Sequence, residues 1–165
     1  MDTAPAYYHS PFGTFEILTS DTGIRSLRLI PEKKPTAAPV SNYLQRDCIR
    51  QLEAYFKRQL KQFDLPLDWT GAPAFHQSVW EELLLIPYGH TISYLAIAEA
   101  LGDAKSVRAV GQANRNNPIP IIVPCHRVIA KNGDLHGYYY GLDMKRALLE
   151  LENPMSFAEQ GRLFD

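Results

Sequence analysis

The sequence predicts an α+β protein built from two small domains, and three observations support this. Residues 13–30 carry strand-like patterns around an Asp-Thr-Gly turn, residues 75–115 change to helical periodicity, and Thr-Gly-Ala-Pro-Ala at 70–74 is typical of a linker. We therefore expect an N-terminal mixed α/β domain over residues 1–70 and a mainly helical C-terminal domain over residues 71–165. The length allows most apolar side chains to be buried without disulfides.

The first domain is expected to contain a hairpin, one helix and an edge strand. Residues 13–30 form the hairpin. Ser41 is a candidate N-cap for the helix, whose apolar residues recur at helical spacing and place Cys48 in the core. Residues 63–69 alternate in strand fashion, and Pro66 restricts that strand to a sheet edge.

Short helices are expected in the second domain. An apolar helix over residues 75–86 comes first. Ser93 then suits the N-cap of a helix that Gly102 ends, and Asp103 suits the N-cap of the next helix, which runs to Arg115. Two short helices joined by a Gly-containing turn are typical of a helix-turn-helix, in which the second helix faces DNA.

The second of these two helices has an unusual composition. Small residues would let its backbone approach another surface closely, and longer polar residues recur at i, i+4 and i+7. The small residues include Ser106, Ala109 and Gly111, and the polar row is Arg108, Gln112 and Arg115. Tight packing against the core would favour the same small residues, so the composition alone leaves both interpretations open.

Composition indicates an ordinary soluble protein, with 45% apolar and 21% charged residues. The aliphatic runs are too short to span a membrane, and the N-terminus has no signal-sequence pattern, so we expect no membrane association and a reducing, cytosolic compartment. A disulfide between Cys48 and Cys125 is disfavoured there. We also expect no metal site, because the five histidines show no metal-ligand spacing with either cysteine.

Positive charge is concentrated in one segment, although the formal net charge is only −1. Residues 105–131 hold five of the 17 Lys and Arg and none of the 18 Asp and Glu. A phosphate-bearing partner would account for this cluster, and so would chance.

The stretch Pro-Cys-His-Arg-Val at 124–128 places a thiol beside an imidazole inside an apolar run. Burial favours the neutral thiol, so Cys125 needs a base and a positive field to act as a nucleophile. His126, the next residue, is the candidate for that base. Neighbouring side chains of an extended segment point to opposite sides, so we expect a bridging water between them. Glu152 falls on the apolar stripe of the last helix and is the candidate carboxylate for orienting the imidazole.

The region from about residue 75 to 152 resembles the O6-alkylguanine-DNA alkyltransferases (methylated-DNA–protein-cysteine methyltransferases). The motifs that carry the resemblance are P-C-H-R-V, S-Y at 93–94, R-A-V-G at 108–111, N-P at 117–118, G-Y at 137–138 and K-x-x-L-L-x-x-E at 145–152.

The resemblance implies a fold and a reaction. The fold is a ribonuclease-H-like N-terminal domain followed by a winged-helix-like helix-turn-helix domain. The protein would be a monomer without a cofactor that flips O6-alkylguanine out of duplex DNA and moves the alkyl group, chiefly methyl, irreversibly to Cys125 in a single turnover. Its place would be the cytoplasm in a bacterium or archaeon, or the nucleus in a eukaryote.

The resemblance also implies roles for further residues. Tyr94 would bond the purine and supply a proton to the departing guanine, with Cys125, His126 and Glu152 completing the catalytic set. Arg108 would enter the duplex where the target base has left. The substrate-binding residues would be Asn117, Val128, Tyr138, Tyr139 and Tyr140, and the DNA-binding residues Ser106, Arg108, Ala109, Gly111, Gln112 and Arg115.

Two departures from the family pattern bear on substrate breadth. Tyr140 stands where other members have glycine, so the cavity is expected to accept methyl more readily than bulky alkyl groups. Gln112 is larger than the small residue sometimes found at its position.

Two other classes of function remain open, a non-catalytic module that binds alkylated DNA and a helix-turn-helix regulator. Cys125 argues against the first, and the second predicts DNA sequence preference without a covalent product. A cysteine hydrolase is weaker still, because nothing marks an oxyanion hole.

Overall fold

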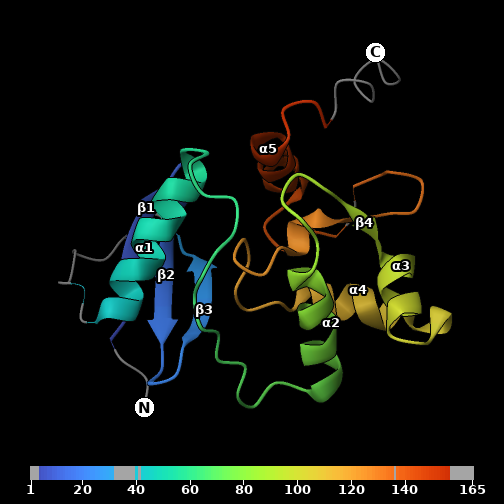
Figure 1. Cartoon of the computed structure of the whole chain (residues 1–165), viewed down its shortest axis with the longest axis horizontal. Helices are drawn as coiled ribbons and strands as arrows, with labels where there is room; N and C mark the ends of the chain where they lie inside the picture. The colour runs from blue at the N-terminus through green and yellow to red at the C-terminus, as the bar shows by residue number, and fades with distance from the viewer. Residues whose placement is uncertain (1–3, 32–39, 41, 136, 157–165) are drawn as a thin grey trace. The chain divides into compact units, whose positions relative to one another are not determined.

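The computed structural model describes residues 4–31, 40, 42–135 and 137–156. Among these, the residues within Met1–Gly71 and Pro118–Ile122 form one compact unit, and those within Ala72–Asn117 and Val123–Asp165 form another. The first is a small sheet with one helix and the second is mainly helical, so the predicted α+β class is confirmed (Figure 1).

The first unit is built on a three-stranded antiparallel sheet in the order β1-β2-β3. Its strands are β1 (Ala6–Ser10), β2 (Gly13–Thr19) and β3 (Ile24–Leu29), and α1 (Tyr43–Phe56) packs across one face (Figure 1). The predicted hairpin of β2 and β3 is confirmed. Strand β1 was not predicted, because its five residues carry too short an alternation to stand out from the preceding loop.

Helix α1 begins after Asn42, whose side-chain oxygen accepts a hydrogen bond from the Gln45 N–H at 2.8 Å. Asn42 is therefore the N-cap, while Ser41, the residue predicted for that role, lies outside the described residues. The placement of Cys48 in the core is confirmed, since its side chain is fully buried.

The strand predicted over residues 63–69 is wrong. Only Leu67 forms a bridge, parallel to Ile24, in which the Ile24 N–H donates to the Pro66 carbonyl at 2.8 Å and the Asp68 N–H donates to the Ile24 carbonyl at 2.9 Å. Proline has no N–H with which to continue a ladder, so the pairing ends after one residue. A Cβ on Gly23 would lie 2.7 Å from the Pro66 oxygen, which explains why glycine stands at this close approach.

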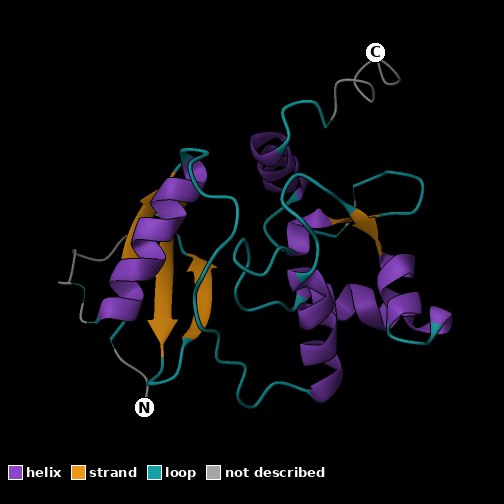
Figure 2. Cartoon of the chain, viewed as in Figure 1, coloured by secondary structure: helices purple, strands orange, loops and turns teal. Residues whose placement is uncertain are grey.

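The second unit contains four α-helices among its described residues (Figure 2). They are α2 (Ala74–Leu84), α3 (Tyr94–Ala100), α4 (Val107–Arg115) and α5 (Leu142–Glu152). The predicted cap of α3 is confirmed, because the Ser93 hydroxyl accepts from the Ala96 N–H at 3.0 Å.

The prediction for Asp103 needs correction. Its carboxylate accepts from the Lys105 N–H at 2.9 Å and caps a 3-10 turn, η1 (Ala104–Ser106), after which α4 begins at Val107. The bond to the N–H two residues on closes a tighter turn than an α-helical cap would, so one turn of 3-10 helix separates cap and α-helix.

A two-stranded parallel sheet joins the helices of the second unit. Strands β4 (Ile92–Ser93) and β5 (Val128–Ile129) pair Ile92 with Val128 (Figure 2). Strand β5 follows a 3-10 turn, η2 (Cys125–Arg127), and β4 directly precedes α3. In this parallel register η2 ends beside Thr91 and α3 begins beside Ala130, so the Cys-His-Arg turn and the start of α3 lie at opposite ends of the same short ladder. No helix among the described residues is both long and apolar enough to cross a bilayer.

Candidate active site and DNA-binding surface

Cys125 opens the 3-10 turn η2 and is 5% exposed. Its N–H donates to the Val123 carbonyl at 2.8 Å, and the Arg127 N–H donates to the Pro124 carbonyl at 3.0 Å. The expectation of an extended segment here is therefore wrong. In a 3-10 turn successive side chains project about 120° apart, so the argument from opposite faces does not apply.

His126 lies beside Glu152 in the interior of the second unit, as predicted from the apolar stripe of α5. The His126 Nε2 and the Glu152 Oε2 are 2.6 Å apart, and the two side chains are 0% and 1% exposed. The His126 Nδ1 is buried and has no hydrogen-bond partner within the described part of the chain. This nitrogen is therefore available to exchange a proton with a group on the other side of the ring.

Arg127 binds the same carboxylate and was not among the predicted site residues. Its Nε donates to the Glu152 Oε1 at 2.8 Å and its Nη2 to Oε2 at 3.0 Å. Its Nη1 donates to the Ile86 carbonyl at 2.7 Å, and the guanidinium lies 5.8 Å from the centre of the Tyr88 ring. The buried cluster is therefore a triad of His126, Glu152 and Arg127.

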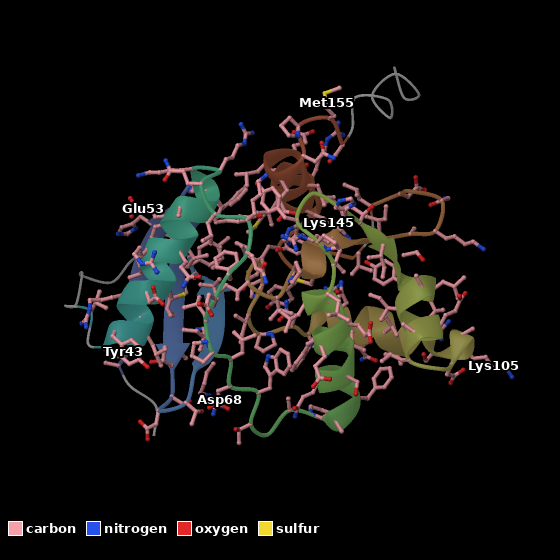
Figure 3. All side chains as sticks on the ribbon, in the orientation of Figure 1. Tyr43, Glu53, Asp68, Lys105, Lys145 and Met155 are labelled. Atoms are coloured by element: carbon pink, nitrogen blue, oxygen red, sulfur yellow. The ribbon has the colours of Figure 1, made fainter. Side chains whose placement is uncertain are left out.

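Lys145 is a second residue that the sequence reasoning missed. Its side chain is completely buried, and its ammonium donates to the Tyr94 hydroxyl at 3.4 Å. Figure 3 shows Lys145 inside the unit, whereas Lys105 projects outward from η1. A signal was present, because Lys145, Leu148 and Glu152 fall at i, i+3 and i+7 on one face of α5.

Two asparagines hold the loop that carries the thiol. The Asn117 amide donates to the Val123 carbonyl at 2.8 Å, and the Asn114 amide donates to the Cys125 carbonyl at 3.3 Å. Asn117 was predicted to tie this loop down, and Asn114, on α4, was not. Because Trp80 on α2 also donates to the Ala113 carbonyl at 2.9 Å, α4 is fixed to both the core and the cysteine loop.

Burial dominates the ionisation of the site. It raises the pKa of the Cys125 thiol to about 11, against the opposing effects of the Asn117 hydrogen bond and the Lys145 charge. Burial also raises the pKa of Tyr94 to about 12 and lowers that of Lys145 to about 8. Cys125 is thus a thiol, and Tyr94 a protonated phenol, at neutral pH in the protein alone.

The His126–Glu152 pair is shifted in a way that suits a base. Burial lowers the pKa of His126 although Glu152 acts to raise it. Burial also opposes the charge on Glu152, but the His126 and Arg127 partners outweigh it and hold the pKa of that carboxyl far below its usual range. The pair is therefore a neutral imidazole against a carboxylate, ready to accept one proton.

Three tyrosines form the loop before α5. Tyr138 is buried and its hydroxyl has no partner within the described residues, whereas Tyr139 is 63% exposed. The Tyr140 ring is half-buried and meets the rings of Tyr139 and Tyr138 at 4.9 and 6.3 Å. Val128, the remaining predicted substrate residue, is buried in β5 directly after the 3-10 turn η2.

A cleft of about 720 Å³ lies between α4 and the segments that carry Tyr94 and Lys131. Four of the predicted DNA-binding residues line it, namely Arg108, Gly111, Gln112 and Arg115. Ala109 is exposed on the same helix, and Ser106 is half-buried at its N-cap. The structure thus brings the four lining candidates to one surface that also holds Tyr94.

Gly111 separates the two interpretations of the small residues on α4. The nearest atom to a Cβ built there is Tyr94 Cδ1 at 3.9 Å, an ordinary contact distance. The packing of the helix therefore does not require glycine at this position.

Within the described residues there is no group of three or more His, Cys, Asp or Glu able to hold a metal ion.

Two family models cover most of the chain. Residues 5–69 match the ribonuclease-like domain, and residues 74–154 the DNA binding domain, of 6-O-methylguanine DNA methyltransferase. The chain belongs to the 6-O-methylguanine DNA methyltransferase family. This membership confirms the resemblance drawn from the P-C-H-R-V motif and its companions.

Individual members of the 6-O-methylguanine DNA methyltransferase family match along nearly their whole length. The methylated-DNA–protein-cysteine methyltransferase of Methanosarcina acetivorans is 46% identical over 151 residues, covering 89% of this chain and 96% of that protein. The protein of the same name from Mycobacterium tuberculosis H37Rv is 43% identical over 162 residues, covering 94% and 95%. A crystal structure of the M. tuberculosis OGT in complex with DNA has a TM-score of 0.81 and 43% identity, covering 91% and 92%.

Proposed function

We propose that this methyltransferase repairs duplex DNA by moving an alkyl group, chiefly methyl, from O6 of guanine to the Cys125 sulfur in a single turnover. The observation that carries the proposal is the buried Cys125 in one 3-10 turn with a neutral His126, whose Nε2 is held 2.6 Å from the Glu152 carboxylate. A soft thiolate suits displacement at an alkyl carbon. The resulting thioether has no easy route back to a thiolate, which accounts for the single turnover.

The proposed steps balance in protons and electrons. The Cys125 thiol gives its proton through a bridging water to His126 Nδ1, and Glu152 stabilises the resulting cation. The thiolate attacks the alkyl carbon as the carbon–O6 bond breaks, and the bonding pair leaves with guanine. Tyr94 then gives its proton to the departing purine, and the Lys145 ammonium beside its hydroxyl stabilises the phenolate that remains.

The remaining site residues are proposed to shape the base pocket. Asn117 holds the cysteine loop, and backbone groups of Cys125, Val128 and Tyr139 read the edge of guanine. Tyr138 lies against the flipped base, where its buried hydroxyl can gain a partner. Tyr140 limits the room for alkyl groups larger than methyl.

We propose that α3 and α4 act as a helix-turn-helix with α4 facing DNA. The exposed side chains of Arg108, Gln112 and Arg115 on one cleft support this, as does Gly111, whose small size the fold itself does not need. Ser106 and Ala109 complete the surface that approaches the duplex. Arg108 would fill the space left by the flipped base.

We propose domains of residues 1–70 and 71–165 and a monomer that acts without a membrane. We also propose a cytoplasmic location, since the relatives named above come from an archaeon and a bacterium.

Intact-protein mass spectrometry after incubation with an O6-methylguanine duplex tests the proposed reaction. We expect one added methyl per protein, mapped to Cys125, and no further reaction once one equivalent is consumed. Cys48→Ser is the matched control and should still react. Cys125→Ser should bind the same duplex but gain no mass. Continued turnover, or a methyl mapped to Cys48, contradicts the proposal.

A further inference from the structure

Arg127 holds the Glu152 carboxylate in one orientation. The Nε and Nη2 of its guanidinium meet the two carboxylate oxygens at 2.8 and 3.0 Å, which is the side-on bidentate geometry that a planar fork imposes. Oε2 is shared, because it also lies 2.6 Å from His126 Nε2. The Gly89 N–H also donates to Oε1, at a longer 3.5 Å. The two short bonds from Arg127 therefore contribute most to the plane of the carboxylate, and with it to the direction from which the carboxylate meets the imidazole.

The guanidinium is itself anchored. Its third nitrogen, Nη1, donates to the Ile86 carbonyl at 2.7 Å, just beyond the end of α2, and one face lies against Tyr88. The Arg127 side chain is only 8% exposed and Glu152 is 1% exposed. A buried arginine with all three nitrogens hydrogen-bonded has little rotational freedom. The backbone carbonyl of Ile86 therefore helps to fix the position of the Glu152 carboxylate on α5.

Arg127 also supplies a permanent charge. With a neutral imidazole the Arg127–Glu152 pair sums to zero, and the buried carboxylate is neutralised before His126 accepts a proton. If Arg127 were absent, the carboxylate would have only the imidazole as its counter-charge, and His126 would hold a proton more tightly. The other charged groups that act on His126 are Glu152 and Lys145 on α5, and the ionisable side chains near the cluster are Cys125 in η2, Tyr138 before α5 and Tyr94 on α3.

We propose that Arg127 is the positioning residue of the His126–Glu152 pair, fixing the carboxylate to the segment after α2 and keeping its charge from tying up the imidazole. This inference rests on the proposed alkyl transfer, in which His126 must start unprotonated. It assigns Arg127 no contact with the DNA base or with the reacting carbon.

Three variants separate charge from geometry. Arg127→Met removes both, Arg127→Lys keeps the charge without the fork, and Arg146→Met removes an arginine from the exposed side of α5 as a matched control. Two quantities are measured: the single-turnover transfer rate as a function of pH, and the titration of the His126 ring by NMR in ¹⁵N-histidine-labelled protein without DNA.

Arg127→Met is expected to raise the pH at which His126 titrates, and the acid limb of the rate profile with it, by about one pH unit. Arg127→Lys is expected to leave that titration near the parent value and to slow transfer roughly tenfold or more. Arg146→Met should change neither. Parent-like titration in Arg127→Met, or a parent-like rate in Arg127→Lys, overturns the proposal.

A further variant distinguishes loss of folding from loss of the proposed role of Arg127. If Arg127→Met does not fold, the double variant Arg127→Met/Glu152→Gln, which leaves no unpaired buried charge, is expected to fold and to titrate His126 at lower pH than the parent. An unfolded double variant would show that Arg127 is needed for reasons beyond the carboxylate, and would sink the inference. A parent protein that gains no methyl refutes the proposed function alone, because the His126 titration is still read without DNA.

Discussion

At the residue scale, the candidate site holds two buried cations, Arg127 against the Glu152 carboxylate and Lys145 against the Tyr94 hydroxyl. Cys125 and His126 could be proposed as nucleophile and base because they are adjacent in sequence, and Glu152 because helical spacing placed an acid on an apolar stripe. Arg127 and Lys145 were missed for a physical reason. A lysine or arginine in a sequence is expected to be solvated, and only its three-dimensional partners justify burial. For Arg127 those partners are Glu152 and Ile86, which lie 25 and 41 residues away along the chain.

Glu152→Gln tests the role of the carboxylate. Glu152 acts to raise the pKa of His126, so its neutralisation lowers that pKa further and moves the acid limb of the rate profile to lower pH. The rate itself should fall about 10- to 100-fold, because the imidazole loses its orienting and charge-stabilising partner. Single-turnover rates measured between about pH 5 and pH 9, at pH intervals small enough to locate the acid limb, report both effects. DNA affinity should hardly change. A profile that matches the parent would exclude the relay.

Tyr140→Gly tests the size of the pocket. Removal of a half-buried ring next to Tyr138 and Tyr139 should open space on the alkyl side of the base. The expected result is a higher ratio of the benzyl rate to the methyl rate, measured on two oligonucleotides that differ only in the O6 substituent. The ratio cancels any general loss of activity from a more flexible loop. An unchanged ratio would remove Tyr140 as a determinant of substrate breadth.

At the element scale, helices with a clear cap or stripe were predictable and the connections between elements were not. The end of α3 and its cap at Ser93 follow from local chemistry. The pairing of β4 with β5 does not, because two residues in each strand are too few for a periodic pattern. Yet this pairing ties the segment that leads into α3 and Tyr94 to the segment that follows the Cys-His-Arg turn.

Arg108→Ala tests the action of α4 on DNA. A guanine inside a duplex must be rotated out of the stack, at a cost of about a few kcal/mol, and an inserted guanidinium would offset part of this. Transfer from duplex O6-methylguanine should therefore slow by roughly a hundredfold. Reaction with the free base should change much less.

Arg115→Ala, at another exposed arginine of the same cleft, is the matched comparison. A lost phosphate contact would chiefly weaken binding and lower its dependence on salt. Binding at two salt concentrations, measured beside the rates, separates the two effects. Equal slowing on duplex and free base would rule out the flipping role of Arg108.

At the scale of the whole molecule, the chain changes units shortly before Cys125. The segment Pro118–Ile122 belongs with the first unit, where the Leu27 N–H donates to the Pro118 carbonyl at 2.9 Å, and Val123 returns to the second. No local pattern predicts such a crossing, since it depends on a bond between residues 91 positions apart. Ile121 in this segment has a φ of 73°, which is strained for a β-branched residue.

Each unit also contains a carboxylate with a lowered pKa. In the first unit, hydrogen bonds from Ser20 and from the Thr70 hydroxyl and N–H hold the pKa of Asp68 well below its usual range. In the second, His126 and Arg127 do the same for Glu152. Because the folded pKa lies below the unfolded one, each group contributes stability that is present above the unfolded pKa and is lost as the pH falls toward the folded pKa.

The last prediction concerns the acid stability of the two units. Glu152→Gln should lower the free energy of unfolding at pH 7 by about 3 kcal/mol, because Arg127 is left without its buried counter-charge. This difference should shrink as the pH falls below about 4.3, where the unfolded parent begins to take up the proton that the variant cannot bind. Asp68→Asn should also lower the free energy of unfolding, and that difference should shrink as the pH falls below about 3.9.

The chain has two tryptophans, Trp69 in the first unit and Trp80 in the second, so single-tryptophan versions report urea unfolding of each unit separately. We expect Glu152→Gln to change the curve from Trp80 and Asp68→Asn to change that from Trp69. A loss of stability that stays constant from pH 7 to about pH 3 would mean that packing, and not the charge on these carboxylates, accounts for their contribution.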